Sequence, residues 1–340
     1  MAGAGAGMSA GLGVKRSRSL PHLNSALLRS VGAQRIRSVG ILVPFLILFA
    51  ILSLTSSSFA TKVNMLNILD QQSATLIIAA AGTLVLVAGG IDLSVGAIYG
   101  LAGVTSAHFA LQTSPGIAIF LGIGAGVIIG LANGIVTTVF RINALIATLA
   151  MSFIVTGCAS LVTKGNLLVL FEEPGFGKLA RTEFLGVKTS IWLMVAAVLA
   201  IGLLLSATTA GRYMYAAGGN AEAARLAGVR VGGVRVLTFV ISGAAAGLAG
   251  VIDTSRVLSA QASAGDTALA FTVLAGIVVG GTSILGGEGA VWRTVVGVLF
   301  IALIGNGYIL LKLDPLYEQI TMGVILLAAV GLDSLSRRRP

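Results

Sequence analysis

The stretch Leu93–Phe140, LSVGAIYGLAGVTSAHFALQTSPGIAIFLGIGAGVIIGLANGIVTTVF, contains no Asp, Glu, Lys or Arg and decides the class of this chain. A helix needs about 20 apolar residues to cross the hydrocarbon core of a bilayer, so this stretch is long enough for two crossings. Turn residues interrupt it at Gln112–Gly116, where they suit a surface and would be costly in lipid. The stretch therefore predicts two membrane-spanning helices joined by a turn.

The remainder of the chain has the same character. Hydrophobic residues make up 56% of it and charged residues only 10%, far from the composition of a soluble globular protein. Eight further stretches lack charged residues, and each is assigned one helix: residues 39–61, 71–91, 142–163, 189–211, 236–252, 267–287, 294–311 and 319–332. The sequence thus predicts an all-α, polytopic membrane protein with ten transmembrane helices over residues 39–333.

The placement of basic residues predicts the orientation. If the N-terminus lies in the cytoplasm, 15 of the 22 Lys and Arg residues fall on the cytoplasmic side. The positive-inside rule favours this arrangement, with both termini and residues 211–235 inside. The net charge of +10 is then a signal of topology. The basic residues are scattered over separate loops without aromatic neighbours, which argues against nucleic-acid binding.

Both ends of the chain are basic. Residues 1–38 combine a Gly/Ala-rich start with six basic and no acidic residues, and they lack the apolar core and cleavage site of a signal peptide. We expect a disordered cytoplasmic tail here and a short basic cytoplasmic C-terminus over residues 334–340.

The segment Gly211–Arg230, GRYMYAAGGNAEAARLAGVR, is a polar exception between apolar runs. Its Glu222-Ala223-Ala224 core favours a helix, and Gly228 can end that helix in a left-handed conformation. A short rigid helix parallel to the membrane is what a soluble motor protein would push against. We therefore predict a coupling loop over residues 211–235.

The sequence offers no constellation for catalysis, nucleotide binding or metal binding. Gly175-Phe176-Gly177-Lys178 lacks the first glycine of a phosphate loop, and Leu179 stands where Ser or Thr would hold magnesium. His22 and His108 are not spaced as metal ligands, and Cys158 is the single cysteine. The chain is therefore predicted to be no enzyme, and ATP and magnesium, if used, must bind a partner chain.

Glycines recur at helical spacing within the predicted spans. Such small faces let helix backbones approach closely, which is a main source of association in lipid. A smooth wall along a transport pathway is the alternative interpretation. The residues are Gly122, Gly126, Gly130 and Gly134 in one span and Gly96 and Gly100 in the span before it.

A weak internal repeat relates the two halves. Ala79–Gly82 precedes Asp92, and Ala244–Gly247 precedes Asp253 with a gap shorter by about one helical turn. Under the ten-helix count, spans 2–5 match spans 7–10 in opposite orientation, with Asp92 toward the cytoplasm and Asp253 toward the outside. This predicts an inverted repeat, as in transporters whose pathway lies between the halves. Chance similarity between two Ala/Gly-rich helices is the alternative.

Polar residues within the spans are candidates for a pathway or a helix break. Glycines on both sides of Asp92 favour a break, where Asp92 or Ser94 would cap the first amides of the third span. An ionisable side chain at this depth is also expected to face protein or a wet cavity. We expect interhelical hydrogen bonds in preference to substrate contacts for three further residues, Asn133, Asn143 and Asn306.

Three segments together resemble the ribose/xylose-type sugar permeases of bacterial ABC importers: Gly89–Gly96, Gly218–Gly228 and Gly280–Gly289. The resemblance covers about residues 40–333. It implies a transmembrane subunit that works as a dimer, receives sugar from a periplasmic binding protein and is driven by cytoplasmic ATPase subunits. The family's coupling segment would fall on Gly219, Asn220, Glu222, Ala223, Ala224, Arg225 and Gly228.

The sequence therefore predicts a bacterial inner-membrane permease that passes a monosaccharide by alternating access, with residues 164–189 as the landing surface for the binding protein. A branched-chain amino-acid ABC permease is one alternative. An ion-coupled secondary transporter is another, although it would need a coupling-ion site and the spans hold few acids besides Asp92 and Asp253.

Overall fold

The computed structural model describes residues 40–314 and 316–337, and these form helices joined by short links. The predicted tail, residues 1–38, lies outside the described residues. The elements are α2 (Leu42–Thr55), α3 (Lys62–Gln71), α4 (Ser73–Val87), α5 (Val95–Ala110), α6 (Pro115–Thr138), α7 (Ala144–Thr163), β1 (Leu168–Val169), α8 (Pro174–Arg181), β2 (Glu183–Phe184), β3 (Val187–Lys188), α9 (Thr189–Ala207), α10 (Thr209–Gly219), α11 (Ala221–Leu226), α12 (Val231–Val257), β4 (Ser259–Ala260), α13 (Thr267–Val279), α14 (Val291–Leu310) and α15 (Leu316–Arg337).

Each of the ten predicted spans contains a helix, which confirms the helical membrane class. Among the described residues, five helices are long and apolar enough to cross a membrane: α6, α7, α9, α12 and α14. Helices α3 and α4 meet the same criterion only together, as a pair bent by 52°. The apolar helices α2, α5 and α13 and the first part of α15 are shorter. Ten crossings therefore stay a prediction.

Glycines explain why two of these helices are short. Helix α5 begins only at Val95 because the chain leaves α4 through Gly89, whose φ of +79° is left-handed. Helix α13 ends at Val279 and is followed by Gly281, with φ +83°. Glycine adopts such angles without the steric penalty of a Cβ. A non-helical link thus precedes α5 and another follows α13, and both links lie between apolar helices.

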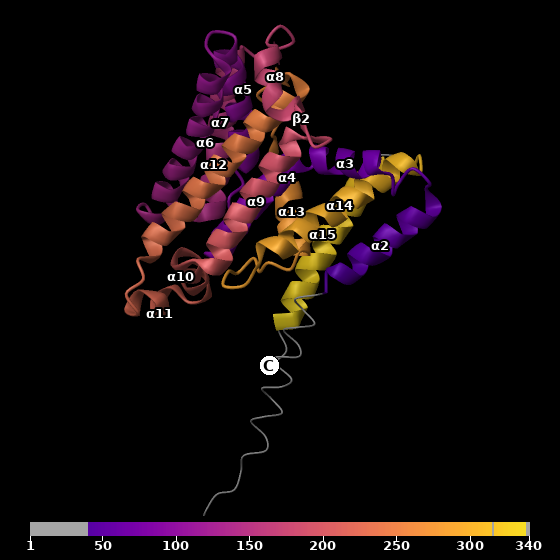
Figure 1. Ribbon diagram of the computed structural model, residues 1–340. Helices are drawn as coiled ribbons and strands as arrows, with labels where there is room; N and C mark the ends of the chain where they lie inside the picture. The colour runs from indigo at the N-terminus through magenta and orange to yellow at the C-terminus, as the bar shows by residue number, and fades with distance from the viewer. Residues whose placement is uncertain (1–39, 315, 338–340) are drawn as a thin grey trace, which may run out of the picture. The chain divides into compact units, whose positions relative to one another are not determined.

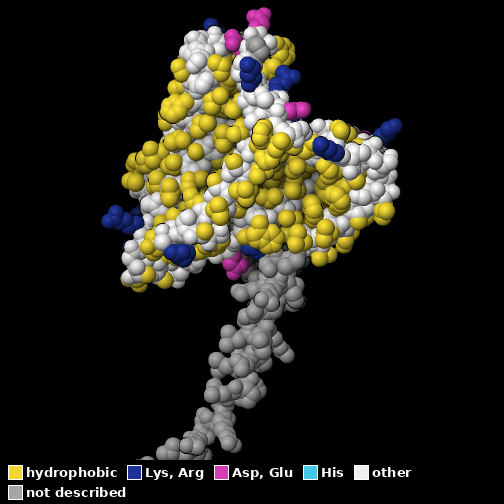
Figure 2. Space-filling model, viewed as in Figure 1, with side chains coloured by type: hydrophobic (Ala, Val, Ile, Leu, Met, Phe, Trp, Pro, Cys, Tyr) yellow, Lys and Arg dark blue, Asp and Glu magenta, His cyan; other side chains and the backbone are white. Residues whose placement is uncertain are grey.

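The two ends of the helices differ. At one end lie α8 and the hairpin β2–β3, and at the other lie α10 and α11 (Figure 1). Between these ends the surface is largely hydrophobic, with charged side chains gathered toward its edges (Figure 2). Phe120 on α6, Phe153 on α7 and Leu203 on α9 are each at least 60% exposed. An exposed apolar surface of this extent fits contact with lipid.

Helices α6 and α12 pack glycine against glycine. A Cβ added at Gly126 would collide with the carbonyl oxygen of Gly243, and one at Gly130 with that of Phe239. Gly243 faces Gly126 and Gly130 in return. The prediction that this glycine stripe serves packing is confirmed, and it applies equally to Gly96, which meets the backbone of the link before α13.

Replacing Gly126 by Ala should lower the free energy of unfolding by about 1–3 kcal/mol, because the added methyl group must force α6 and α12 apart. Gly124→Ala is the matched control, since the same methyl group on the same helix meets no atom within 4 Å. Thermal unfolding of the purified protein in detergent compares the two. Equal melting temperatures would show that the helices do not pack as closely as described.

Candidate functional site

Helix α11 is the short helix predicted within the polar segment. The Asn220 side chain caps it, with Oδ1 accepting a hydrogen bond from the Ala223 amide at 2.9 Å. Beyond its end, Gly228 has a φ of +86°, and its amide donates to the Arg225 carbonyl at 3.0 Å. The predicted helix and its glycine stop are confirmed.

The outer face of α11 contributes little to the fold. Glu222 and Arg225 form an ion pair of 2.6 Å, but their side chains are 65% and 69% exposed. A solvent-exposed pair of this kind contributes about 0–1 kcal/mol to stability. Leu226, at the end of the helix, is 80% exposed. These side chains therefore offer a surface that a partner can use without disturbing the packing of the helices.

The predicted loop over residues 211–235 consists mostly of helix. Its first part belongs to α10, which Thr208 caps by accepting a hydrogen bond from the Gly211 amide at 3.2 Å. Its last part belongs to α12, where the Arg235 guanidinium donates from Nε to the Ala88 carbonyl at 3.2 Å. The arginine thus satisfies a backbone oxygen near the end of α4. Between α9 and α12 the chain therefore forms α10, α11 and the short links that join them.

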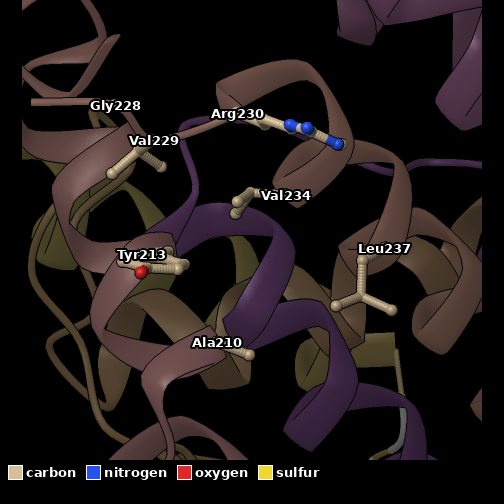
Figure 3. A pocket seen from close by; sticks show the side chains of 8 residues that line it. Ala210, Tyr213, Gly228, Val229, Arg230, Val234 and Leu237 are labelled. Carbon is tan, nitrogen blue, oxygen red and sulfur yellow. The ribbon is translucent and has the colours of Figure 1, made fainter. Parts of the chain in front are cut away.

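A cavity of about 400 Å³ lies beside α11, between α10 and the start of α12 (Figure 3). Its wall is mostly apolar, with one charged group. The residues that shape it are Tyr213, Val229, Arg230, Val234 and Leu237. The cavity can accept a side chain from a protein that docks on α11.

Backbone segments from three distant parts of the chain meet at the end of α10. The Gly287 amide donates to the Val87 carbonyl at 2.9 Å. A Cβ added at Gly286 would lie 3.0 Å from the Gly89 Cα and 3.1 Å from the Gly218 carbonyl oxygen. A Cβ at Gly218 would collide with the Val87 carbonyl. We call this contact, made by Val87, Gly89, Gly218, Gly286 and Gly287, the glycine junction.

Two further features hold the junction together. Gly286 and Gly287 both adopt left-handed angles, with φ values of +89° and +75°. The Tyr215 hydroxyl of α10 donates to the Gly289 carbonyl at 2.8 Å. Burial raises the pKa of Tyr215, so the hydroxyl keeps the proton that it donates throughout the neutral pH range.

Sequence reasoning missed the junction. Its glycine pairs were noted as parts of three separate segments, but pairing them in space requires the fold. One indication of the junction exists in the sequence: a glycine pair occurs in each of the three segments that resemble the sugar permeases.

Asp92 occupies the break between α4 and α5, as predicted. Its Oδ1 accepts hydrogen bonds from the Ser94 amide at 3.0 Å and the Ser94 hydroxyl at 2.6 Å, and its Oδ2 accepts one from the Ser242 hydroxyl at 2.8 Å. Ser94 accepts in turn from Asn133 Nδ2 at 2.7 Å. The carboxylate therefore links the start of α5 to α12, and through Ser94 to α6. The interhelical role expected for Asn133 is confirmed.

The predicted cap of α5 is wrong. The N-cap residue of this helix is Ser94, and its side chain makes no capping hydrogen bond because its hydroxyl is directed to Asp92. Asp92 reaches the amide of the N-cap residue itself and none of the first helical amides.

Asp253 lies on α12 eleven residues after Ser242, which corresponds to about 16 Å along the helix. Its Oδ2 accepts a hydrogen bond from the Tyr99 hydroxyl at 2.5 Å, and its Oδ1 pairs with Arg256. Asp253 thus lies near the end of α12, whereas Asp92 contacts the middle of this helix, on the side of Asp253 that is nearer α10. The backbones differ, however, because α12 continues unbroken through Asp253. The inverted repeat stays a prediction.

The two remaining asparagines have different roles. Asn143 is exposed and caps α7, its Oδ1 accepting from the Leu145 amide at 3.0 Å, so the interhelical bond predicted for it is wrong. Asn306 and Asn64 exchange two hydrogen bonds of 3.0 and 3.1 Å between α14 and α3, which confirms the prediction there.

A third buried acid escaped the sequence analysis. Asp70 is 4% exposed and accepts from Lys188 Nζ at 2.7 Å and the Ser190 hydroxyl at 2.5 Å. It was missed because it directly precedes a charge-free stretch and so was counted with the loop. The contact fixes α3 to the start of α9.

Apolar helices long enough to cross a membrane, with a short exposed helix at one end, define a polytopic helical membrane protein. A family model described as "Branched-chain amino acid transport system / permease component" matches residues 64–330, and the chain belongs to this family. The chain is accordingly a transport subunit. No solved structure matches it.

Curated relatives cover most of the chain. The ribose import permease protein RbsC of Escherichia coli (strain K12) is 36% identical over 86% of this chain and 92% of its own length. RbsC of Bacillus subtilis (strain 168) is 38% identical over 85% and 91%. The L-arabinose transport system permease protein AraH of Escherichia coli (strain K12) is 37% identical over 88% and 91%.

Replacing Gly218 by Ala should open the glycine junction, because the methyl group competes with the Gly287 amide for the space at the Val87 carbonyl. Amide hydrogen exchange at Gly287 should accelerate by about three- to tenfold, the loss of one hydrogen bond. In Gly219→Ala, the adjacent control, the added Cβ lies 3.9 Å from its nearest neighbour, Gly287 Cα. Equal exchange rates in both variants would contradict the junction.

Proposed function

We propose that this chain is the transmembrane subunit of an ABC importer that carries a monosaccharide of the pentose class across the bacterial inner membrane. The observation that carries the proposal is the exposed, capped helix α11, whose neighbour α10 contacts the intramembrane Asp92 link through the glycine junction. The names of the curated relatives, which refer to ribose and L-arabinose, support the substrate class.

The coupling segment is where the ATPase acts in this proposal. A cytoplasmic ATPase subunit, which holds ATP and magnesium, docks on Glu222, Arg225 and Leu226 and fills the adjoining cavity. Movement of the ATPase displaces α10 together with α11, because a single residue, Asn220, separates the two helices. The junction passes the displacement to the link that holds Asp92. Alternating access follows if the helices attached to that link move as one rigid body. The subunit acts as a homodimer within the lipid bilayer.

The opposite end receives the periplasmic binding protein. Helix α8 is fastened to α12 there, since the Ser255 hydroxyl donates to the Phe176 carbonyl at 2.7 Å and accepts from the Ala180 amide at 3.1 Å. Phe184 and Leu185 in the adjoining hairpin are 61% and 77% exposed and offer apolar contacts. A protein that docks here acts on the same helix that carries Asp253.

Two alternatives are less well supported. The family description names branched-chain amino acids, but the curated relatives that cover 85–88% of the chain are sugar permeases by name. An ion-coupled transporter would need an available buried acid, yet Asp70 is paired with Lys188 and Asp253 with Arg256. Asp92 already accepts three hydrogen bonds.

The charge reversal Glu222→Lys tests the coupling segment. The fold should be unchanged, because Glu222 takes part only in an exposed ion pair. The affinity for the ATPase and the rate of pentose uptake should each fall by at least about tenfold, which corresponds to a loss of about 1.4 kcal/mol of binding free energy. Lys312→Glu, a charge reversal at an exposed residue outside both the coupling segment and residues 164–189, should leave both unchanged. Proteoliposomes with the ATPase and the loaded binding protein provide the measurement.

The same assay tests the function itself. Pentose uptake should require ATP and should be indifferent to proton or sodium gradients. Uptake driven by an ion gradient without ATP would refute the ABC importer, and normal uptake by Glu222→Lys would place the docking surface elsewhere.

Orientation is tested by thiol labelling in a Cys158→Ser background, since the native cysteine is exposed. A cysteine at Glu183 should react with an impermeant reagent added to intact cells, whereas a cysteine at Glu222 should react only after the membrane is opened. Reaction of both from the same side would refute the proposed topology.

A further inference from the structure

A second cavity, of about 320 Å³, lies at the end of α12 that carries Asp253. It opens between α5 and α12, and the antiparallel pair β1–β4 borders it. Its volume is at the lower end of the range of ligand pockets, about 300–1,000 Å³. The cavity therefore suits a small ligand.

The polar groups of this cavity are arranged for hydrogen bonding to an uncharged molecule. The Asp253 carboxylate is neutralised by Arg256, and three donors already use most of its lone pairs. Tyr99 is 8% exposed, and its hydroxyl oxygen can still accept a hydrogen bond after donating to Asp253. Ser259 and Gln261 add groups that both donate and accept, and their side chains bond to no other residue that the structure describes.

Apolar groups complete the wall. Leu167, Val257 and Ala264 line the same cavity, and Gly100 and Gly103 add backbone to its wall, where the missing side chains allow close packing against Ala262 and Thr254. A cation would find the carboxylate already paired, and an anion would find the guanidinium paired. Hydroxyl groups with intervening C–H surfaces match both the polar and the apolar parts.

We infer that this cavity is an entry site that holds the monosaccharide through Tyr99, Asp253 and Gln261 after its release from the binding protein. The inference rests on the proposed function and assigns the residues that contact the sugar. Binding is weak, because the site is small and must pass its ligand onward.

The site is tested by protection of a cysteine from labelling. Ala264 lines the cavity and is exposed, and it is not one of the residues proposed to hold the sugar, so Ala264→Cys is introduced in a Cys158→Ser background. The complex with its ATPase is held without nucleotide in membranes. D-ribose and L-arabinose at high millimolar concentration should slow the reaction of this cysteine with an impermeant thiol reagent. L-leucine, and betaine as an osmotic control, should not. A cysteine at Glu183, an exposed residue outside the cavity, should show no protection by any of them.

The contribution of the Tyr99 hydroxyl to sugar binding is tested by removing it. Tyr99→Phe in the same background should raise the pentose concentration for half-protection by about fivefold, because one hydrogen bond to the sugar is lost. Tyr213→Phe, which removes a hydroxyl from the cavity beside α11, should leave it unchanged.

Absence of pentose protection, protection unaffected by Tyr99→Phe, or protection by L-leucine would each overturn the site. ATP-driven pentose uptake by the unmodified complex is measured in parallel. If uptake occurs without protection, only the entry site is refuted, whereas a complex that imports no pentose refutes the proposed function.

Discussion

The close approach of backbone to backbone at the glycine junction is the constraint on which the account depends. Gly218 at the end of α10, Gly89 beyond α4 and Gly286 beyond α13 lie so near one another that a single methyl group at Gly218 would collide with a carbonyl oxygen. Contacts between main chains have few alternative arrangements, whereas long side chains can repack. In the proposed function, a displacement of α10 would therefore be transmitted to the segments that enter the bundle.

Helix α12 connects this junction to the opposite end of the molecule. Near its start, Arg235 donates a hydrogen bond to the end of α4, and in its middle Ser242 donates one to Asp92. Toward its end, Asp253 and Ser255 accept hydrogen bonds from α5 and α8. Its glycines lock it against α6 along the way. One continuous helix thus touches both candidate docking ends. This arrangement lets a binding event at one end bias the conformation at the other, provided that the helix moves as a unit.

Much of the fold could be predicted from the sequence. Among the described residues, each predicted span contains a helix, and the composition of residues 220–228 predicted α11 with its glycine stop. Hydrogen-bond partners could not be predicted in the same way. Ser94 is a good capping residue by type, but the carboxylate of Asp92 competes for its hydroxyl, and Asn143 caps its own helix because it begins one at the surface. The junction and the Tyr99–Asp253 contact join residues 68 to 200 positions apart, so no local pattern reveals them.

The most direct test of the central claim measures whether α11 and the junction move together. Spin labels at Ala227, an exposed residue directly after α11, and at Leu285, which is 72% exposed, report the distance between α11 and the loop that carries Gly286. A label pair at Ala227 and Leu185 reports the distance to the opposite end. On adding ATP to the complex with its ATPase, the first distance should stay constant and the second should change. A change in the Ala227–Leu285 distance with no change toward Leu185 would show that α11 moves without carrying the junction.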